Sequence, residues 1–261
     1  MKICVCMKQV PGTTEVKIDP GTNSLVRQGI ENVINPFDTY AIEEGVRLKE
    51  RQGGIVTVIS MGPPQAEEAL RETISLGADE AVLLSDAAFA GADTWATAFT
   101  LSKAIRKLGD CDLIICGRQT IDGDTGQVGP EIAEMLDLPF VAYVSQVENI
   151  ADHAILLRRM VEEGHEIIET TLPAVITVTK EINIPRLPSL RGISKSKSAV
   201  IPTWGIAELG IDKDMVGRAG SATEVIKVFF PQRVCVAEML EGDPETQATA
   251  LIEKLRTCLL Y

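Results

Sequence analysis

Residues 117–136, GRQTIDGDTGQVGPEIAEML, follow the apolar run CDLIICG directly and combine glycines with two carboxylates. Gly123, Gly126 and Gly129 allow the backbone to come close to a ligand such as a phosphate group. The segment is not a Walker A loop, because no Gly-Lys-Ser/Thr sequence follows the glycines. It also differs from the dinucleotide fingerprint, since its glycines are spaced GxxGxxG rather than GxGxxG.

A calcium loop is excluded as well. Counted from Asp122, the sixth and twelfth positions are Gln127 and Ala133, where an EF-hand needs glycine and glutamate. What remains is a helix that begins at Gly129-Pro130, whose first N–H groups are unpaired and favour an anion such as a pyrophosphate. Asp122 and Asp124 would then bond ribose hydroxyls or tie the loop through its own N–H groups. The loop alone leaves open that they only cap turns.

The elements around this loop indicate a parallel sheet. Short β-branched runs alternate with helical patterns, which is typical of βαβ units with helices on both faces. Three further strand–helix junctions then lie at the edge of the sheet where α/β folds bind ligands: Cys6-Met7-Lys8, Asn35 to Asp38, and Met61-Gly62-Pro63. A nucleotide site built from all of these junctions is therefore predicted. The strands are expected at 2–10, 55–61, 80–86 and 111–117, and the helices at 36–51, 63–77, 94–109 and 129–136.

The pattern changes from about residue 142, where four apolar runs follow each other without a helix between them. We expect 142–150, 154–161, 165–172 and 174–180 to be antiparallel strands added to the sheet. The predicted fold is α/β, a Rossmann-like doubly wound, mainly parallel sheet with added antiparallel strands and a C-terminal arm. Residues 1–182 would form the nucleotide-binding domain. Residues 183–261 would form a recognition loop and an extended arm with a terminal helix at 244–260, packed on a partner subunit.

Composition narrows the function classes. The net charge of −12 argues against nucleic-acid binding, although four basic residues lie between 186 and 197 with no acid between Glu181 and Glu208. The six cysteines form no CxxC pair and there are only two histidines, so no metal centre is expected. No apolar run approaches the roughly 18–20 residues that span a bilayer, so no transmembrane segment is predicted and the expected location is the cytoplasm.

Five pieces together resemble the small (β) subunit of the electron-transfer flavoproteins over nearly the whole chain. They are VCMKQVP, NPFDTYAIEEGVRLKE, SMGPPQAEEALRETISLGADEA, GRQTIDGDTGQVGPEIAEML and RMVEEGHEIIETTLPAVIT. The last piece resembles the family signature. Leu157, which stands at the opening position of that signature, is a minor departure from it. NPFD and IDGDTGQVGP are similar to the electron-bifurcating branch, in which this subunit holds a whole FAD. Gly126 stands where that branch commonly has alanine. The ordinary branch holds AMP here and has no redox centre of its own.

The resemblance implies site residues position by position. The nucleotide contacts would be Cys6, Asn35, Pro36, Phe37, Asp38, Met61, Gly62, Gly117, Arg118, Gln119, Thr120, Ile121, Asp122, Gly123, Asp124, Thr125, Gly126, Gln127 and Val128. The stretch RLPSLRGISKSK resembles the family's recognition loop, with Leu190 as anchoring leucine, and the partner-recognition residues would be Leu190, Arg191, Ile193, Lys195 and Lys197. No catalytic side chain is expected, because the flavin carries the chemistry.

The resemblance also implies the partners. The chain would pair with an α subunit and pass electrons among NADH, ferredoxin and a flavin-dependent dehydrogenase of the acyl-CoA or lactate type. Two alternatives stay open. One is the ordinary electron carrier with AMP in this site, which relays electrons from acyl-CoA dehydrogenases. The other is an ATP-binding regulatory module of the stress-protein kind, which the long arm and the basic loop argue against.

Overall fold

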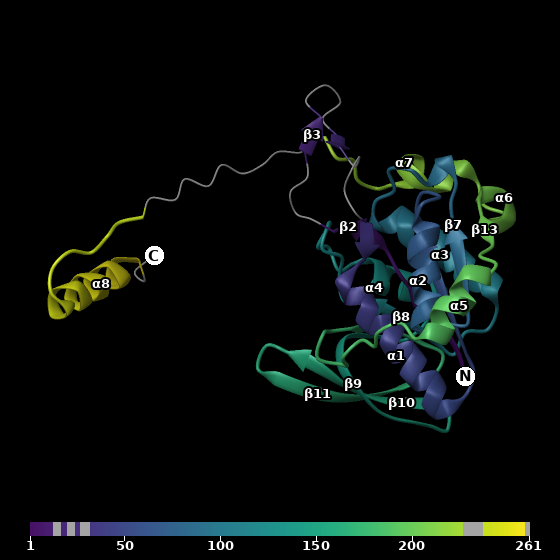
Figure 1. Cartoon of the computed structure of the whole chain (residues 1–261), viewed down its shortest axis with the longest axis horizontal. Coiled ribbons are helices and arrows are strands. Elements are labelled where there is room, and N and C mark those ends of the chain that lie inside the picture. Colours follow the sequence, from purple (N-terminus) through teal and green to yellow (C-terminus); the bar gives the residue numbers. More distant parts are fainter. Residues whose placement is uncertain (13–16, 20–23, 27–31, 227–236, 259–261) are drawn as a thin grey trace. The chain divides into compact units, whose positions relative to one another are not determined.

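The computed structural model describes residues 1–12, 17–19, 24–26, 32–226 and 237–258. It divides into two compact units, Met1–Ile226 and Lys227–Tyr261. The first contains a nine-stranded sheet in the order β11-β10-β9-β12-β8-β1-β6-β7-β13 (Figure 1). Its strands are β1 (Lys2–Cys6), β6 (Ile55–Met61), β7 (Glu80–Leu84), β8 (Leu113–Gly117), β9 (Phe140–Ala151), β10 (Ala154–Val161), β11 (Gly164–Thr171), β12 (Ala174–Val178) and β13 (Thr203–Trp204).

The remaining strands form two small antiparallel pairs, and the helices connect or flank the large sheet. The pairs are β2 (Gln9–Pro11) with β5 (Asn32–Ile34), and β3 (Lys17–Asp19) with β4 (Ser24–Val26). The α-helices of the first unit are α1 (Pro36–Gln52), α2 (Ala66–Leu76), α3 (Thr94–Leu108), α4 (Val128–Leu136), α5 (Leu190–Ser198), α6 (Ile206–Leu209) and α7 (Gly217–Gly220). Two 3₁₀ turns are η1 (Ala87–Phe89) and η2 (Lys213–Met215), and α8 (Pro244–Cys258) belongs to the second unit.

Local signals explain the helix ends of the βαβ part. The side chain of Asp93 accepts the N–H of Ala96 at 3.0 Å, which confirms the predicted cap of α3. Gly77 and Gly109 end α2 and α3 with φ of 122° and 85°, values that favour glycine. Pro36 stands in the first turn of α1, where its missing N–H costs nothing.

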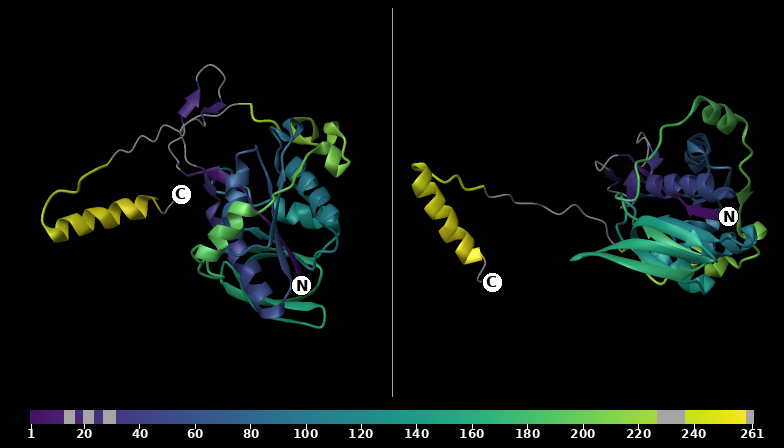
Figure 2. Two further views of the ribbon diagram at one scale, coloured as in Figure 1. Left: turned by 45° about the vertical axis from the view of Figure 1, so that its right-hand side comes forward. Right: turned by 90° about the horizontal axis from the view of Figure 1, so that it is seen from below.

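The two faces of the sheet are covered by different helices. Ile42 of α1 and Leu70 of α2 pack against Ile3, Val5 and Val58 on one face. On the other face, helices α3 and α4 pack against the alternate strand residues, among them Cys4, Ile59 and Ile114. The helix-covered parallel sheet that the sequence predicts is therefore confirmed, and the strands β9 to β11 form a long ribbon at its end (Figure 2).

One strand differs from the sequence prediction. The run 174–180 was expected to be antiparallel, but β12 pairs parallel with β8 and parallel with β9, between which it is inserted. In the described part of the large sheet, the antiparallel pairs are β9–β10 and β10–β11. The physical reason is burial, since all five residues of β12 are buried and an uninterrupted apolar run is typical of a central parallel strand.

The expected domain boundary at residue 182 also needs correction. Residues 183–226 belong to the first compact unit. Part of the expected extended loop is the helix α5, which lies against α2, and Thr203–Trp204 adds the edge strand β13 beside β7. Arg71 of α2 bonds the backbone oxygens of Ser196 and Ala199 at 2.8 and 3.1 Å. This segment is therefore ordered by its own domain. The predicted C-terminal helix is present as α8.

Candidate nucleotide-binding site

The ends of β1, β6 and β8 lie side by side at one edge of the sheet. Cys6 is in register with Cys116 of β8 and with Ile59 of β6. Beyond the last strand residue, the N–H of Met7 still bonds the carbonyl of Ile59 at 2.9 Å, and the N–H of Gly62 bonds Leu84. The junctions named by the sequence therefore meet at the carboxyl edge, where open α/β sheets bind ligands.

Asn35, directly before α1, holds the glycine-rich loop in place. Its Nδ2 donates to the carbonyl of Gln119 at 2.9 Å, and its Oδ1 accepts the N–H of Ile121 at 3.2 Å. The side chain is fully buried. Because a buried amide needs its partners, this pair of bonds fixes the start of the loop relative to α1.

Asp38 joins the ends of β1 and β8 from inside the protein. Its carboxylate accepts the N–H of Lys8 at 2.8 Å and also that of Gly117. Burial raises the pKa of Asp38 to about 7, against the bonds from Lys8, Asn35 and Gly117 that lower it. A Cβ on Gly117 would lie 2.3 Å from Oδ1 of Asp38, so only glycine fits there. The buried carboxylate thus orders the crevice.

Lys8 supplies the lysine that the glycine-rich loop itself lacks. Its Nζ lies 2.7 Å from Oδ2 and 2.9 Å from Oδ1 of Asp122. Burial would raise the pKa of Asp122, but the Lys8 ammonium holds this pKa below its usual value. Further along, Asp124 and Gly126 have φ of 54° and 64°, so the loop turns sharply twice. The carboxylate of Asp122 is therefore tied to β1.

The start of α4 offers donors for an anion. Among the described residues no side chain caps this helix, so its first N–H groups face the loop. Gly129 has no room for a side chain, because a Cβ would lie 2.5 Å from Cγ2 of Thr177. Residues 121–127 are exposed. An exposed glycine loop before an uncapped helix, with carboxylates beside it, fits a diphosphate and a ribose.

The structure thus brings most of the predicted nucleotide residues together. Cys6 is buried at the end of β1, Met61 and Gly62 lie at the end of β6, and Phe37 and Asp38 lie in the first turn of α1. Residues 117–128 form one continuous loop that joins β8 to α4. Their contact with a nucleotide stays a prediction.

Sequence reasoning missed Tyr143 of β9. The guanidinium of Arg118 lies over the ring of Tyr143 at 5.5 Å and over that of Phe37 at 5.8 Å. Tyr143 is 47% exposed and has φ of 59°, a region that a bulky residue rarely adopts. The position of Tyr143 could not be predicted from the local sequence, because it depends on the pairing of β9 with β12.

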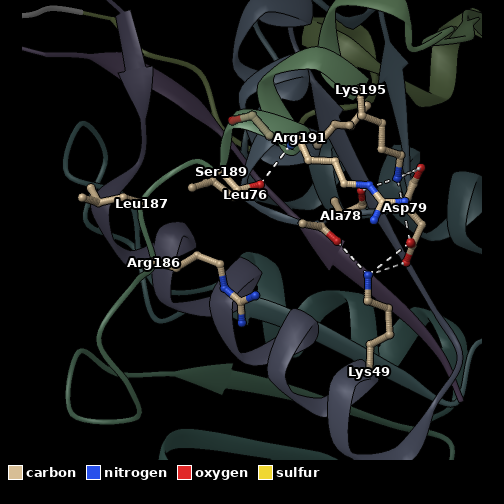
Figure 3. Close-up of a pocket in the computed structure, with 13 residues that line it drawn as sticks. Lys49, Leu76, Ala78, Asp79, Arg186, Leu187, Ser189, Arg191 and Lys195 are labelled. Carbon is tan, nitrogen blue, oxygen red and sulfur yellow. Dashed lines mark hydrogen bonds and ion pairs between the residues drawn. The ribbon is translucent and has the colours of Figure 1, made fainter.

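A hollow lies away from these strand ends, between α1, the end of α2 and α5 (Figure 3). Its volume is about 400 Å³. Lys49 bonds the carbonyl of Gly77 and both carboxylate oxygens of Asp79, at 2.7 to 3.1 Å. Lys195 bonds the carbonyls of Ala78 and Asp79 at 3.1 and 3.3 Å. Two lysines therefore hold the turn that follows α2.

The residues predicted for partner recognition divide into two groups. Leu190 is 87% exposed, and Ile193 and Lys197 are also exposed. Arg191 and Lys195 line the hollow beside α2, and Lys195 points inward to the carbonyl groups (Figure 3). The apolar Leu190 is therefore available to a partner, whereas the ammonium of Lys195 is engaged within the domain.

Comparison with known proteins agrees with this fold. The model of the family described as "Electron transfer flavoprotein domain" matches residues 22–209. The chain is 49% identical over 258 residues to the electron transfer flavoprotein subunit beta of Thermoanaerobacterium thermosaccharolyticum, with 98% of each chain covered. The chain belongs to the electron transfer flavoprotein β-subunit family.

Other relatives in the electron transfer flavoprotein family carry more specific names. The chain is 44% identical to the caffeyl-CoA reductase-Etf complex subunit CarD of Acetobacterium woodii, again over 98% of each chain. It is also 44% identical to Protein FixA of Azotobacter vinelandii, over 98% of this chain and 95% of that one. Electron transfer flavoprotein β subunits pair with an α subunit and are associated with flavin or AMP. In the described part of this chain, no helix has the length and hydropathy needed to cross a bilayer.

Proposed function

We propose that this chain is the FAD-binding β subunit of an electron-bifurcating flavoprotein. The observation that carries the proposal is the loop 117–128, tied to Asn35 and Lys8 and continued by the uncapped start of α4. This loop and NPFD also resemble those of the bifurcating branch, apart from Gly126, where that branch commonly has alanine. With an α subunit, the complex would exchange electrons among NADH, ferredoxin and a flavin-dependent dehydrogenase.

The residues of the crevice have distinct parts in this function. The N–H groups at Val128 and Gly129 would bind the pyrophosphate, and Asp122 would bond the ribose. Asn35 and Asp38 would in addition hold the loop and the end of β1 in place. Bound FAD would accept two electrons from NADH and release them singly to two acceptors.

The dehydrogenase would dock on the exposed apolar residues beside α5. Leu190 and Leu187 are both 87% exposed, on a segment with several basic residues. One or two apolar side chains within a basic surface suit a brief contact that is guided by charge. The relative in a caffeyl-CoA reductase complex favours a dehydrogenase of the acyl-CoA type over the lactate type.

The nucleotide content of the purified heterodimer tests the proposal. The protein is denatured, and the released nucleotides are separated and counted per heterodimer. Two FAD support the proposal. One FAD and one AMP overturn it in favour of the ordinary electron carrier. A second assay measures ferredoxin reduction by NADH in the presence of the dehydrogenase and its acceptor. A heterodimer with two FAD should fail this assay when the dehydrogenase is omitted.

A further inference from the structure

Tyr143 lies at the same edge of the sheet as the glycine-rich loop. Val144 of β9 is in register with Val178 of β12, and Val178 is in register with Gly117, the last residue of β8. The N–H of Arg118 bonds the carbonyl of Val178 at 3.0 Å. Tyr143 therefore directly precedes the residue of β9 that is level with Gly117, the end of β8.

A β-bulge determines the direction of this residue. Val141 pairs with Ile176 and Val144 with Val178, so Ala142 and Tyr143 together oppose the single residue Thr177. The N–H of Tyr143, which the bulge removes from the ladder, donates to Oγ1 of Thr177 at 3.2 Å. Bulges are common beside functional sites, where they redirect a side chain.

The backbone of Tyr143 is strained, and its ring remains half exposed. A φ of 59° is unfavourable for an aromatic residue and would suit asparagine or glycine better. The ring contacts the Arg118 guanidinium, which also lies over Phe37 of α1. Strain of this kind is retained mainly where the side chain has a use.

The ring is also connected to the glycine-rich loop. Nε of Arg118 donates to Oε1 of Gln119 at 2.7 Å, and Gln119 bonds Asp124 in turn. A ligand that orders the loop therefore also orders Arg118 and the ring above it. Phe37, Arg118 and Tyr143 thus form one partly exposed group beside the glycine-rich loop.

We propose that the ring of Tyr143 stacks on the planar heteroaromatic ring of the bound nucleotide, so that Tyr143 is a cofactor-positioning residue of this site. The inference rests on the proposed function, in which this site holds FAD. Stacked aromatic pairs add modestly to binding, so loss of the ring should weaken FAD binding about three- to tenfold.

The test compares variants that separate strain from stacking. Tyr143→Asn relieves the strain and removes the ring, whereas Tyr143→Phe keeps the ring. The control His153→Asn relieves a similar φ of 62° in an exposed turn between β9 and β10. Each heterodimer is diluted serially and freed of unbound nucleotide. The dilution at which the FAD of this subunit is lost gives the dissociation constant of that FAD. The melting temperature without added FAD is measured in parallel.

We expect Tyr143→Asn to melt no lower than the wild type and to bind FAD about three- to tenfold more weakly. Tyr143→Phe and His153→Asn should bind FAD as the wild type does. If Tyr143→Asn binds FAD as tightly as the wild type does, the inference is wrong. It is also wrong if Tyr143→Asn loses the α subunit but keeps its flavin, because the ring then belongs to the subunit interface. The flavin content of the wild type tests the proposed function separately.

Discussion

Lys8 and Asp122 form an ion pair with 2.7 Å between Nζ and Oδ2, which joins the end of β1 to the glycine-rich loop. The two residues are 114 positions apart in the chain. Both side chains are partly exposed, so the pair contributes only about 0.2–1 kcal/mol to the free energy of unfolding. Its importance lies in the position of the loop rather than in stability.

Replacing either partner of this ion pair should affect nucleotide binding more than folding. We expect Asp122→Asn to lose the bound nucleotide during gel filtration, and Lys8→Met to lose less, because Lys8 acts only by holding the loop. The free energy of unfolding should change by less than about 1 kcal/mol in both variants. Asp152→Asn, in the exposed turn after β9, is the control. Full nucleotide retention by Asp122→Asn would contradict the assigned role.

Asn35→Ala should destabilise the domain as well as empty the crevice. The change removes two hydrogen bonds to the loop and leaves polar backbone groups of Gln119 and Ile121 without their partner. We expect the free energy of unfolding to fall by about 1–3 kcal/mol, measured by urea denaturation. Asn35→Asp keeps the acceptor for Ile121 but loses the donor to Gln119. Its effect should be smaller at low pH, because a protonated carboxyl group can donate to Gln119 again. Wild-type stability of Asn35→Ala would show that the loop is held by other contacts.

Stability should decrease with pH between about 4 and 7 because of Asp38. Its folded pKa of about 7 lies above the ordinary value for aspartate, so the folded protein holds a proton that the unfolded chain has lost. The stabilisation that this proton gives is fully present below the pKa of Asp38 in the unfolded chain, and it is lost as the pH rises through 7. We expect Asp38→Asn to remove this slope in urea denaturations at pH 5, 6, 7 and 8. An equal slope in both proteins would refute a proton on Asp38.

Leu190→Ala should slow electron transfer to the dehydrogenase without changing stability. The side chain is 87% exposed, so its truncation leaves no cavity in the domain. We expect a rise in KM for the dehydrogenase of about tenfold or more, as for an interface anchor. Val200→Ala is the matched control, since Val200 is 89% exposed just beyond the same helix. Equal effects of the two variants would mean that Leu190 has no special place in docking.

Arg186→Gln should loosen the segment before α5. The guanidinium bonds Glu43 at 2.8 Å and Glu50 at 2.6 Å, and Glu43 is almost fully buried. Burial alone would raise the pKa of Glu43, but Arg186 and Arg47 hold this pKa below its usual value. We expect a loss of about 1–3 kcal/mol in the free energy of unfolding. Arg159→Gln, which breaks a more exposed pair with Glu166, should cost less than about 1 kcal/mol.

The sequence pattern was sufficient for the elements whose signals are local. Asp93, Gly77 and Gly109 mark the ends of α2 and α3, and the alternation of strands with helices indicates the parallel sheet. The insertion of β12 between β8 and β9 was missed because no helix precedes it, although its unbroken apolar run favoured a central strand.

Long-range contacts explain what else was missed. Asn183 bonds the carbonyl of Tyr40 at 3.0 Å, and Arg186 bonds Glu43, with 143 positions between the partners in each case. No local pattern reveals such contacts, so the segment looked like a free arm. The candidate site was more predictable, because strand ends of a parallel sheet always meet at one edge. The ion pair of Lys8 and the bulge at Tyr143 still required the three-dimensional structure.

The segment that carries Leu190 is held on both sides. Arg186 fixes it to α1, α5 packs on α2, and the edge strand β13 continues the sheet beside β7. Its backbone has therefore lost its conformational freedom during folding, before any partner binds. Binding then needs little further ordering entropy. An electron carrier with such a surface can associate quickly, because no segment has to become ordered during the encounter.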